Sequence, residues 1–156
     1  MRRIDYLNDP DAPKANSIVV ATSVYVDDDE GRILLIRRTD NDLWAMPGGG
    51  MEVGETVSEC AVRETKEETG IDVDITSLVG IFTNPAHVVA YRNGEVRQQF
   101  SICLRARVAG GEIRTSDESS EVRWVHRNEL AQLDIHLDTR RRIDRAMADD
   151  QLAYVD

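Results

Sequence analysis

Three glutamates lie within two turns of one predicted helix. The segment RETKEETGI, from Arg63 to Ile71, contains Glu64, Glu67 and Glu68. At about 100° per residue, these side chains fall within roughly 100° of one another around the helix axis. The same sector carries the apolar residues of the helix, which are Val57, Cys60 and Ala61. The sequence therefore predicts three carboxylates on the face that packs against the protein.

Carboxylates on a packed face need a positive charge to offset them. A solvated acidic helix keeps its glutamates opposite its apolar stripe, whereas buried like charges repel one another and lose hydration. Hard divalent cations such as Mg²⁺, or Mn²⁺ as a substitute, suit carboxylate oxygens. Softer ligands are not grouped in the sequence, because Cys60 and Cys103 are expected to be reduced core thiols. The histidines show no metal-ligand spacing and are expected to be structural or exposed: His87, His126 and His136.

The loop before this helix fits the same site. The segment PGGG, from Pro47 to Gly50, lets the backbone approach a ligand without obstruction by a Cβ atom. Its carbonyls could then reach a metal ion, and its amides could reach phosphate. The loop lacks the Lys-Ser/Thr pair of a P-loop and the spacing of a dinucleotide-binding turn, which argues against ATPase and Rossmann functions.

Together, the loop and the helix resemble the Nudix box, G-x5-E-x7-R-E-U-x-E-E-x-G-U, where U is a bulky aliphatic residue. The matching segment is GGMEVGETVSECAVRETKEETGI, which starts at Gly49. The lead-in WxxPGG also matches, and Thr65 departs from the pattern because it stands where a large aliphatic residue is usual. The positions on pattern are Gly49, Glu55, Arg63, Glu64, Glu67, Glu68, Gly70 and Ile71.

The resemblance to the Nudix family implies a Mg²⁺-dependent hydrolase of a nucleoside diphosphate linked to another moiety. In such an enzyme, water attacks a phosphorus of the pyrophosphate. The family pattern assigns the metal to Glu64, Glu67, Glu68 and the Gly48 carbonyl. Arg63 would hold Glu67 in position, and Glu55 would brace the loop rather than bind metal. The resemblance also implies an α/β/α sandwich with a mixed β-sheet.

Contacts to the substrate are harder to assign from the sequence. Arg37 and Arg38 end a predicted strand and could contact phosphate, or could be solvated. Trp44 could stack on a base, or pack beneath the glycine loop. Gly49 is assigned to the substrate because its backbone can approach a ligand closely.

The substrate class depends on a weak downstream signal. Pro85 is loosely similar to a proline associated with ADP-ribose hydrolysis, but Ala86 replaces the neighbouring glycine of that signature. We expect an ADP-ribose or nucleotide-sugar substrate. The alternatives are a sanitising pyrophosphohydrolase for oxidised nucleoside triphosphates, a non-catalytic nucleotide-binding module, and a purely structural acidic helix.

A further carboxylate is expected from the segment SDESSEVRWV. Some members of the family supply a base or a metal ligand from a mobile loop before a late strand, and Glu118 and Glu121 both lie in this region. We favour Glu118, because a loop carboxylate can move over a bound diphosphate more easily than a strand residue. In the alternative interpretation, both are solvated surface acids.

The predicted elements position this chemistry around a mixed sheet with helices on its faces. Thr56 with Glu59 forms a capping box, and Gly70 ends the helix, which bounds the box helix at Val57–Thr69. Two hairpins are expected, one from Ser17–Val26 with RILLIRR, the other with Asn93-Gly94 as its turn. A strand is expected within DVDITSLVGIFT, and a late strand at EVRWVH. Helices are expected at RNELAQL and TRRRIDRAMA.

Composition limits the remaining choices. A chain of 156 residues suits one domain, in which we expect residues 1–16 to be irregular. The formal net charge of −10 argues against non-specific binding to nucleic acid or to an anionic membrane. The absence of a long apolar run or a secretory signal favours a cytoplasmic location. The segment TRRRIDRAM is expected to be an exposed amphipathic helix, with a homodimer contact as the alternative.

Overall fold

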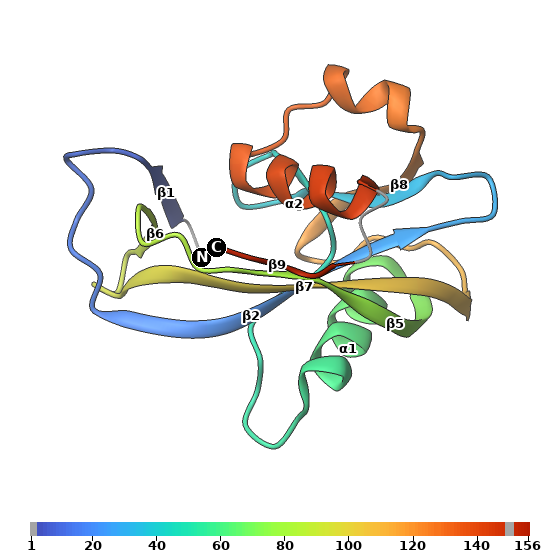
Figure 1. Cartoon of the computed structure of the whole chain (residues 1–156), viewed down its shortest axis with the longest axis horizontal. Helices are drawn as coiled ribbons and strands as arrows, with labels where there is room; N and C mark the ends of the chain where they lie inside the picture. The colour runs from blue at the N-terminus through green and yellow to red at the C-terminus, as the bar shows by residue number, and fades with distance from the viewer. Residues whose placement is uncertain (1–2, 149–151) are drawn as a thin grey trace.

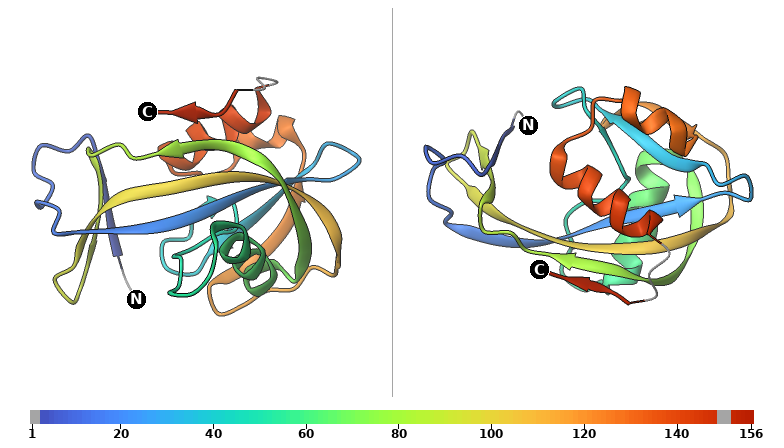
Figure 2. Two further views of the ribbon diagram at one scale, coloured as in Figure 1. Left: turned by 60° about the horizontal axis from the view of Figure 1, so that its bottom comes forward. Right: turned by 45° about the horizontal axis from the view of Figure 1, so that its top comes forward.

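The computed structural model describes residues 3–148 and 152–156. A twisted sheet lies between α1 on one face and α2 with η1 on the other (Figure 1; two further views in Figure 2). The helices are α1 (Val57–Thr69), the 3-10 helix η1 (Arg127–Gln132) and α2 (Leu137–Met147). The strands are β1 (Arg3–Leu7), β2 (Ser17–Asp27), β3 (Ile33–Arg38), β4 (Trp44–Ala45), β5 (Ile71–Phe82), β6 (His87–Tyr91), β7 (Val96–Gly111), β8 (Ser119–Val125) and β9 (Tyr154–Val155).

The sheet is mixed, and its centre is a parallel pair. The main path runs β1-β6-β7-β2-β3-β4, while β5 pairs with β7 and β9, and β8 pairs with β3. The predicted β6–β7 hairpin is confirmed, with Gly94 at a φ of 88° in the turn. The first predicted hairpin is reduced to one pair, Asp27 with Ile33. Over its whole length β2 instead runs parallel to β7.

The N-terminal segment also differs from the prediction. The sequence predicts that residues 1–16 are irregular, but Arg3–Leu7 forms β1, which pairs antiparallel with β6. Its Ile4 is 54% exposed, so the strand has no buried apolar run by which the sequence could show it. Its partner lies far along the chain, at His87–Tyr91, and this long-range pairing satisfies the backbone groups of β1.

Two apolar cores lie on opposite sides of the sheet. The strand β3 shows the division, because Ile33 and Leu35 enter the core under α2, whereas Leu34 and Ile36 enter the core under α1. This alternation follows from the two-residue period of a strand. It explains why the segment RILLIRR is continuously apolar at its centre, since both of its faces are covered.

The helix α1 has the predicted ends. The Thr56 hydroxyl accepts a hydrogen bond from the Glu59 amide at 3.2 Å, and the Glu59 carboxylate accepts one from the Thr56 amide at 2.7 Å. Gly70 adopts a φ of 79°, in the left-handed region that ends helices. Thr65 is fully buried, and its hydroxyl donates to the Ala61 carbonyl. A polar atom at this off-pattern position is therefore satisfied within the helix.

Two further predictions can be checked in the fold. Cys60 and Cys103 are buried free thiols, as expected. The segment RNELAQL forms the 3-10 helix η1 rather than an α-helix, with Leu130 as its buried residue. In the part of the chain that the structure describes, no helix has the length and apolar character needed to cross a membrane.

Candidate active site

The three box glutamates do not share one environment. Glu68 is 2% exposed and Glu64 is half-buried, but the Glu67 side chain is 59% exposed. The prediction that all three face inward is therefore wrong for Glu67. The buried residues of α1 are Cys60, Ala61, Thr65, Glu68 and Thr69, so the covered sector is centred near Ala61 and Glu68. Glu67 lies at the edge of that contact and reaches solvent.

Glu68 is the most perturbed carboxyl of the helix. Its Oε2 accepts a hydrogen bond from the Gly48 amide at 2.9 Å, whereas its Oε1 is buried without a hydrogen-bond partner. Burial raises the pKa of Glu68 to about 8, and the nearby charges of Glu64 and Glu118 add to this, despite opposing effects of the Gly48 amide and Arg38. Without a cation this carboxyl holds a proton near neutral pH, and a bound cation would replace that proton and satisfy the second oxygen.

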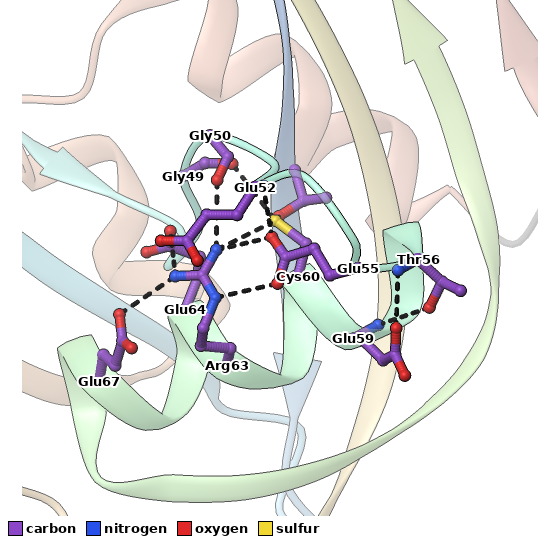
Figure 3. A network of polar contacts seen from close by, with 11 residues as sticks. Gly49, Gly50, Glu52, Glu55, Thr56, Glu59, Cys60, Arg63, Glu64 and Glu67 are labelled. Carbon is purple, nitrogen blue, oxygen red and sulfur yellow. Dashed lines mark hydrogen bonds and ion pairs between the residues drawn. The ribbon is translucent and has the colours of Figure 1, made fainter.

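Arg63 connects Glu55 of the loop with Glu64 and Glu67 of the helix (Figure 3). Its guanidinium donates two hydrogen bonds to Glu55, at 3.0 and 2.8 Å, and contacts Glu64 at 2.8 Å and Glu67 at 3.2 Å. It also donates to the Gly50 carbonyl at 3.2 Å. The hydrogen bonds from Arg63 lower the pKa of Glu55 to about 2. Arg63 thus fixes both the helix acids and the glycine loop.

Glu55 lies in the position expected of a brace. Besides its contacts to Arg63, its carboxylate accepts a hydrogen bond from the Glu52 amide at 2.7 Å. Both of its oxygens are occupied by partners within the loop and helix. The position supports a loop-bracing role and leaves Glu64, Glu67 and Glu68 as the candidates for metal.

The glycine loop packs along β2 at very short range. The Gly49 carbonyl accepts a hydrogen bond from the Thr22 amide, and the Pro47 carbonyl accepts one from the Val24 amide. A Cβ atom at Gly48 would lie 2.1 Å from the Thr22 carbonyl oxygen, and one at Gly49 would lie 2.6 Å from the Glu64 carboxylate. Glycine is required here because the backbone lies directly against the strand and the acid.

The two late glutamates have different surroundings. Glu118 is exposed and contributes to the wall of the cleft beside the glycine loop, whereas Glu121 lies within β8 and pairs with Arg37 at 2.9 Å. The Glu118 backbone is held, because its carbonyl accepts a hydrogen bond from the Thr39 amide and the Ser119 hydroxyl donates to the Glu68 carbonyl at 2.6 Å. Glu118 is therefore anchored next to the box helix, and its side chain alone is free to turn.

A cleft runs from the glycine loop toward β6 and β7. Some of the residues predicted to bind the substrate line this cleft, and others do not. Arg38, Gly48 and Gly49 contribute to its wall. Arg38 is paired with Asp40 at 2.7 Å. Arg37 is not among the lining residues, and it forms ion pairs with Asp42 and Glu121 instead.

Trp44 is mainly a core residue. It is 7% exposed and packs with Met46, Leu130 and Ile135. The guanidinium of Arg123 lies 5.4 Å from the centre of its ring. Although Trp44 borders the cleft, burial and the covering arginine leave no open ring face for a base. Of the two interpretations of this residue, packing is the one that the structure supports.

The far wall of the cleft contains residues that sequence reasoning missed. They come from β1, β6, β7 and the start of α2, and they meet only because these elements pair across long separations. No local pattern marks them, and the sequence predicts histidines that are merely structural or exposed. These residues are Arg3, Asp5, His87, Arg97, Gln98 and His136.

The donor set fits a hard divalent cation. The Glu68 carboxyl lies against the Gly48 amide and the Glu64 carboxylate lies beside Gly49, and the buried Oε1 of Glu68 has no hydrogen-bond partner, so a bound cation would satisfy it. Oxygen donors of this kind suit Mg²⁺ and Mn²⁺. Arg63 offsets only part of the negative charge, because it contacts Glu55, Glu64 and Glu67 but not the buried Glu68 oxygen.

The comparisons with known proteins all indicate the same family. A family model described as the NUDIX domain matches residues 18–147. The chain is 35% identical over 130 residues to a MutT-like protein of Streptomyces ambofaciens, which covers 81% of this chain and 77% of the relative. It is 37% identical over 112 residues to an ADP-ribose pyrophosphatase of Methanocaldococcus jannaschii, which covers 67% of this chain and 60% of that protein. Further relatives are described as nucleoside triphosphatases.

Solved structures show the same architecture. An ADP-ribose pyrophosphatase from Streptococcus suis superposes with a TM-score of 0.67, over 89% of this chain and 98% of that chain. At 22% sequence identity this likeness concerns the fold. The predicted α/β/α sandwich with a mixed β-sheet is confirmed.

Proposed function

The chain belongs to the NUDIX family, and on this premise we propose that it hydrolyses the pyrophosphate bond of a nucleoside diphosphate linked to another moiety, with Mg²⁺ as cofactor. The observation that carries the proposal is Glu68, a buried carboxylate with an unsatisfied oxygen against the glycine loop. This arrangement does not favour the stability of the metal-free protein, because burial penalises the ionised form of Glu68.

Glu64, Glu68 and the Gly48 carbonyl would hold the ions, with Glu67 binding at the exposed edge. When bound, Mg²⁺ would neutralise the diphosphate and lower the pKa of the attacking water. Arg63 keeps Glu64 and Glu67 oriented by direct contacts at 2.8 and 3.2 Å. Glu55 fixes Arg63 in turn, and it holds the loop through the Glu52 amide.

Glu118 is the proposed base. Its side chain is exposed on the wall of the cleft, so it can take a proton from a water placed over the diphosphate. Its backbone is fixed to the box helix through Ser119. General-base work by a positioned side chain requires reach and a defined location, and an exposed side chain on an anchored backbone supports this role for Glu118. Glu121 is less suited, because Arg37 occupies its carboxylate.

An ADP-ribose or nucleotide-sugar substrate is favoured. The cleft continues from the glycine loop to Arg97 and Gln98 on β7, which leaves room for groups on both sides of a diphosphate. The name of the Methanocaldococcus relative points in the same direction. Relatives described as nucleoside triphosphatases keep that substrate class as the second candidate.

A panel of substrates tests this proposal. Untagged protein with Mg²⁺ would be incubated with ADP-ribose, UDP-glucose, dGTP and 8-oxo-dGTP, and the products separated by ion-exchange chromatography. We expect AMP and ribose 5-phosphate from ADP-ribose at the highest kcat/KM. Faster release of pyrophosphate from a triphosphate would favour the second candidate. Binding of these nucleotides without turnover of any would identify a non-catalytic module.

Location and assembly follow from the same proposal. A nucleotide-hydrolysing enzyme of this kind is expected to act in the cytoplasm on small molecules. Arg141 and Arg145 of α2 contact the Tyr154 ring within the chain, so part of the basic face that could form a homodimer contact is already used. Light scattering of the purified protein measures the oligomeric state.

A further inference from the structure

A second group of possible metal ligands lies on the far wall of the cleft, outside the box helix. Asp5 of β1, His87 of β6 and His136 at the start of α2 each offer one ligand atom, and these atoms lie within 4.8 Å of one another. The two imidazole rings stack, with centroids 4.9 Å apart and an interplanar angle of 18°. Three elements that are remote in sequence thus bring two histidines and a carboxylate together.

His87 is poorly satisfied in this position. Its side chain is 5% exposed and lies between two carboxylates, with Nε2 at 3.5 Å from Asp5 and Nδ1 at 3.5 Å from Asp138. Nδ1 of His87 and Oδ2 of Asp138 are both buried without a hydrogen-bond partner. Buried polar atoms are normally paired, and these two face each other, so a proton on Nδ1 is directed to Asp138 and Nε2 is left toward Asp5.

We propose that Asp5, His87 and His136 bind a divalent cation of the Zn²⁺ class. Two imidazoles and one carboxylate are donors that suit Zn²⁺, whereas Mg²⁺ prefers oxygen donors throughout. This site is distinct from the glutamates of α1.

The surroundings of His87 match those of a metal-bound histidine. Such a histidine donates its second ring N–H to a carboxylate, which fixes the orientation of the ring. Asp138 stands behind Nδ1 of His87 in this way, and Asp138 itself lies 3.5 Å from Arg142. With Nδ1–H directed to Asp138, Nε2 is left to face Asp5 and the proposed ion.

Binding requires one side chain to turn. Stacked rings direct their in-plane lone pairs past each other, so His136 must rotate before both rings reach one ion. At present His136 Nδ1 accepts a hydrogen bond from the Asp138 amide at 3.3 Å, a long contact that the ion would replace. Three protein ligands would leave at least one position of the ion open to the cleft.

Protons compete with the ion for this group. Burial lowers the pKa of His87, but the hydrogen bonds to Asp138 and Asp5 outweigh it, and the pKa is raised. The charged neighbours are Asp5, Asp138, Arg3 and Arg142, with His136 stacked on the ring.

Cobalt absorption tests the proposal without measuring activity. Untagged protein would be titrated with Co²⁺ in an excess of Mg²⁺, which keeps the α1 carboxylates occupied. We expect about one equivalent to bind with the intense visible bands of a four-coordinate site, and Zn²⁺ to displace it. Failure of nucleotide hydrolysis would leave this result unaffected, so the two proposals fail separately.

Variants locate the site. His136→Asn keeps a side chain that can cap α2 but removes an imidazole, and we expect at least about 100-fold weaker Co²⁺ binding, as for Asp5→Asn. Asp138→Asn should weaken binding by about 10-fold to 100-fold. The matched control is His126→Asn at an exposed histidine, which should bind as wild type. Absence of tight binding by the wild type, or unchanged bands in folded His136→Asn and Asp5→Asn proteins, would overturn the proposal.

Discussion

At the scale of single residues, Glu68 joins the helix, the glycine loop and the proposed metal. Replacing it with Gln keeps its size and the hydrogen bond from Gly48 but removes the charge that a hard cation needs. We expect kcat to fall by about 100-fold or more, with the fold retained by circular dichroism. Near wild-type turnover by Glu68→Gln would mean that the helix carboxylates are not the site.

The same residue predicts a pH dependence of stability in metal-free protein. Because the pKa of Glu68 is about 8 when folded, against an ordinary value of 4.5, the folded state holds its proton over a range in which the unfolded state has lost it. The contribution of this residue to the free energy of unfolding therefore falls as the pH rises from about 4.5 to 8, and levels off above that range, by a few kcal/mol in total.

The measurement compares wild type with Glu68→Gln in EDTA, since the difference cancels the other titrating groups. The melting temperature of the variant minus that of the wild type should grow between about pH 5 and pH 8. A difference that is constant across this range would show that Glu68 is not buried and desolvated as the structure has it.

Glu118 and Glu121 form a matched pair of acids for the base assignment. Both are carboxylates that reach solvent from the same segment, but only Glu118 lines the cleft. Glu118→Gln should lower kcat by about 100-fold with no change in melting temperature or in substrate affinity measured without turnover. Glu121→Gln is the control and should retain activity. The reverse pattern would transfer the role to the strand residue.

At the scale of elements, the glycine loop gives a prediction that separates folding from catalysis. A Cβ at Gly48 would meet the Thr22 backbone at 2.1 Å, which cannot move without disturbing β2. A Cβ at Gly49 would meet the end of the Glu64 side chain at 2.6 Å, which can turn away. We expect Gly48→Ala to lower the melting temperature strongly, and Gly49→Ala to lose activity with a smaller effect on stability.

Gly54→Ala is the control for backbone strain. Gly54 has a φ of 96°, and a Cβ added there would have no atom within 4 Å, so alanine should cost about 1 kcal/mol through its backbone conformation alone. Thermal melts and initial rates of the three variants provide the comparison. Equal stability losses at Gly48 and Gly54 would contradict the close packing of the loop on β2.

Elements with local signals could be predicted from the sequence. The helix α1 has both of its ends determined by neighbouring residues, Thr56 with Glu59 and Gly70, and the β6–β7 hairpin is determined by its Asn93-Gly94 turn. β1 and the β2–β7 pairing depend on partners far along the chain. Those pairings are made by backbone hydrogen bonds between distant segments, so no short sequence pattern predicts them.

The site residues also divide into those that local spacing predicts and those that depend on tertiary contacts. The box acids and Arg63 lie in one segment, so their grouping could be predicted from spacing. The exposure of Glu67 could not, because it depends on the angle at which α1 meets the sheet. The role of Trp44 also depends on tertiary contacts, since Arg123 reaches its ring from β8.

At the scale of the whole molecule, the sheet brings two groups of possible metal ligands to opposite walls of one cleft. The helix α1 and the glycine loop bring carboxylates to one wall, while β1, β6 and the start of α2 bring histidines and paired charges to the other. A net charge of −10 would repel a diphosphate, so binding of the substrate should depend on a cation between them.

The most direct test is the initial rate of ADP-ribose hydrolysis before and after removal of divalent metal. Protein dialysed against EDTA should show no turnover, because no described cationic side chain contacts the buried oxygen of Glu68, and added Mg²⁺ should restore the full rate. If ADP-ribose is not the substrate, the best substrate of the panel takes its place. Undiminished hydrolysis in EDTA would contradict the metal assignment and the account of the site that depends on it.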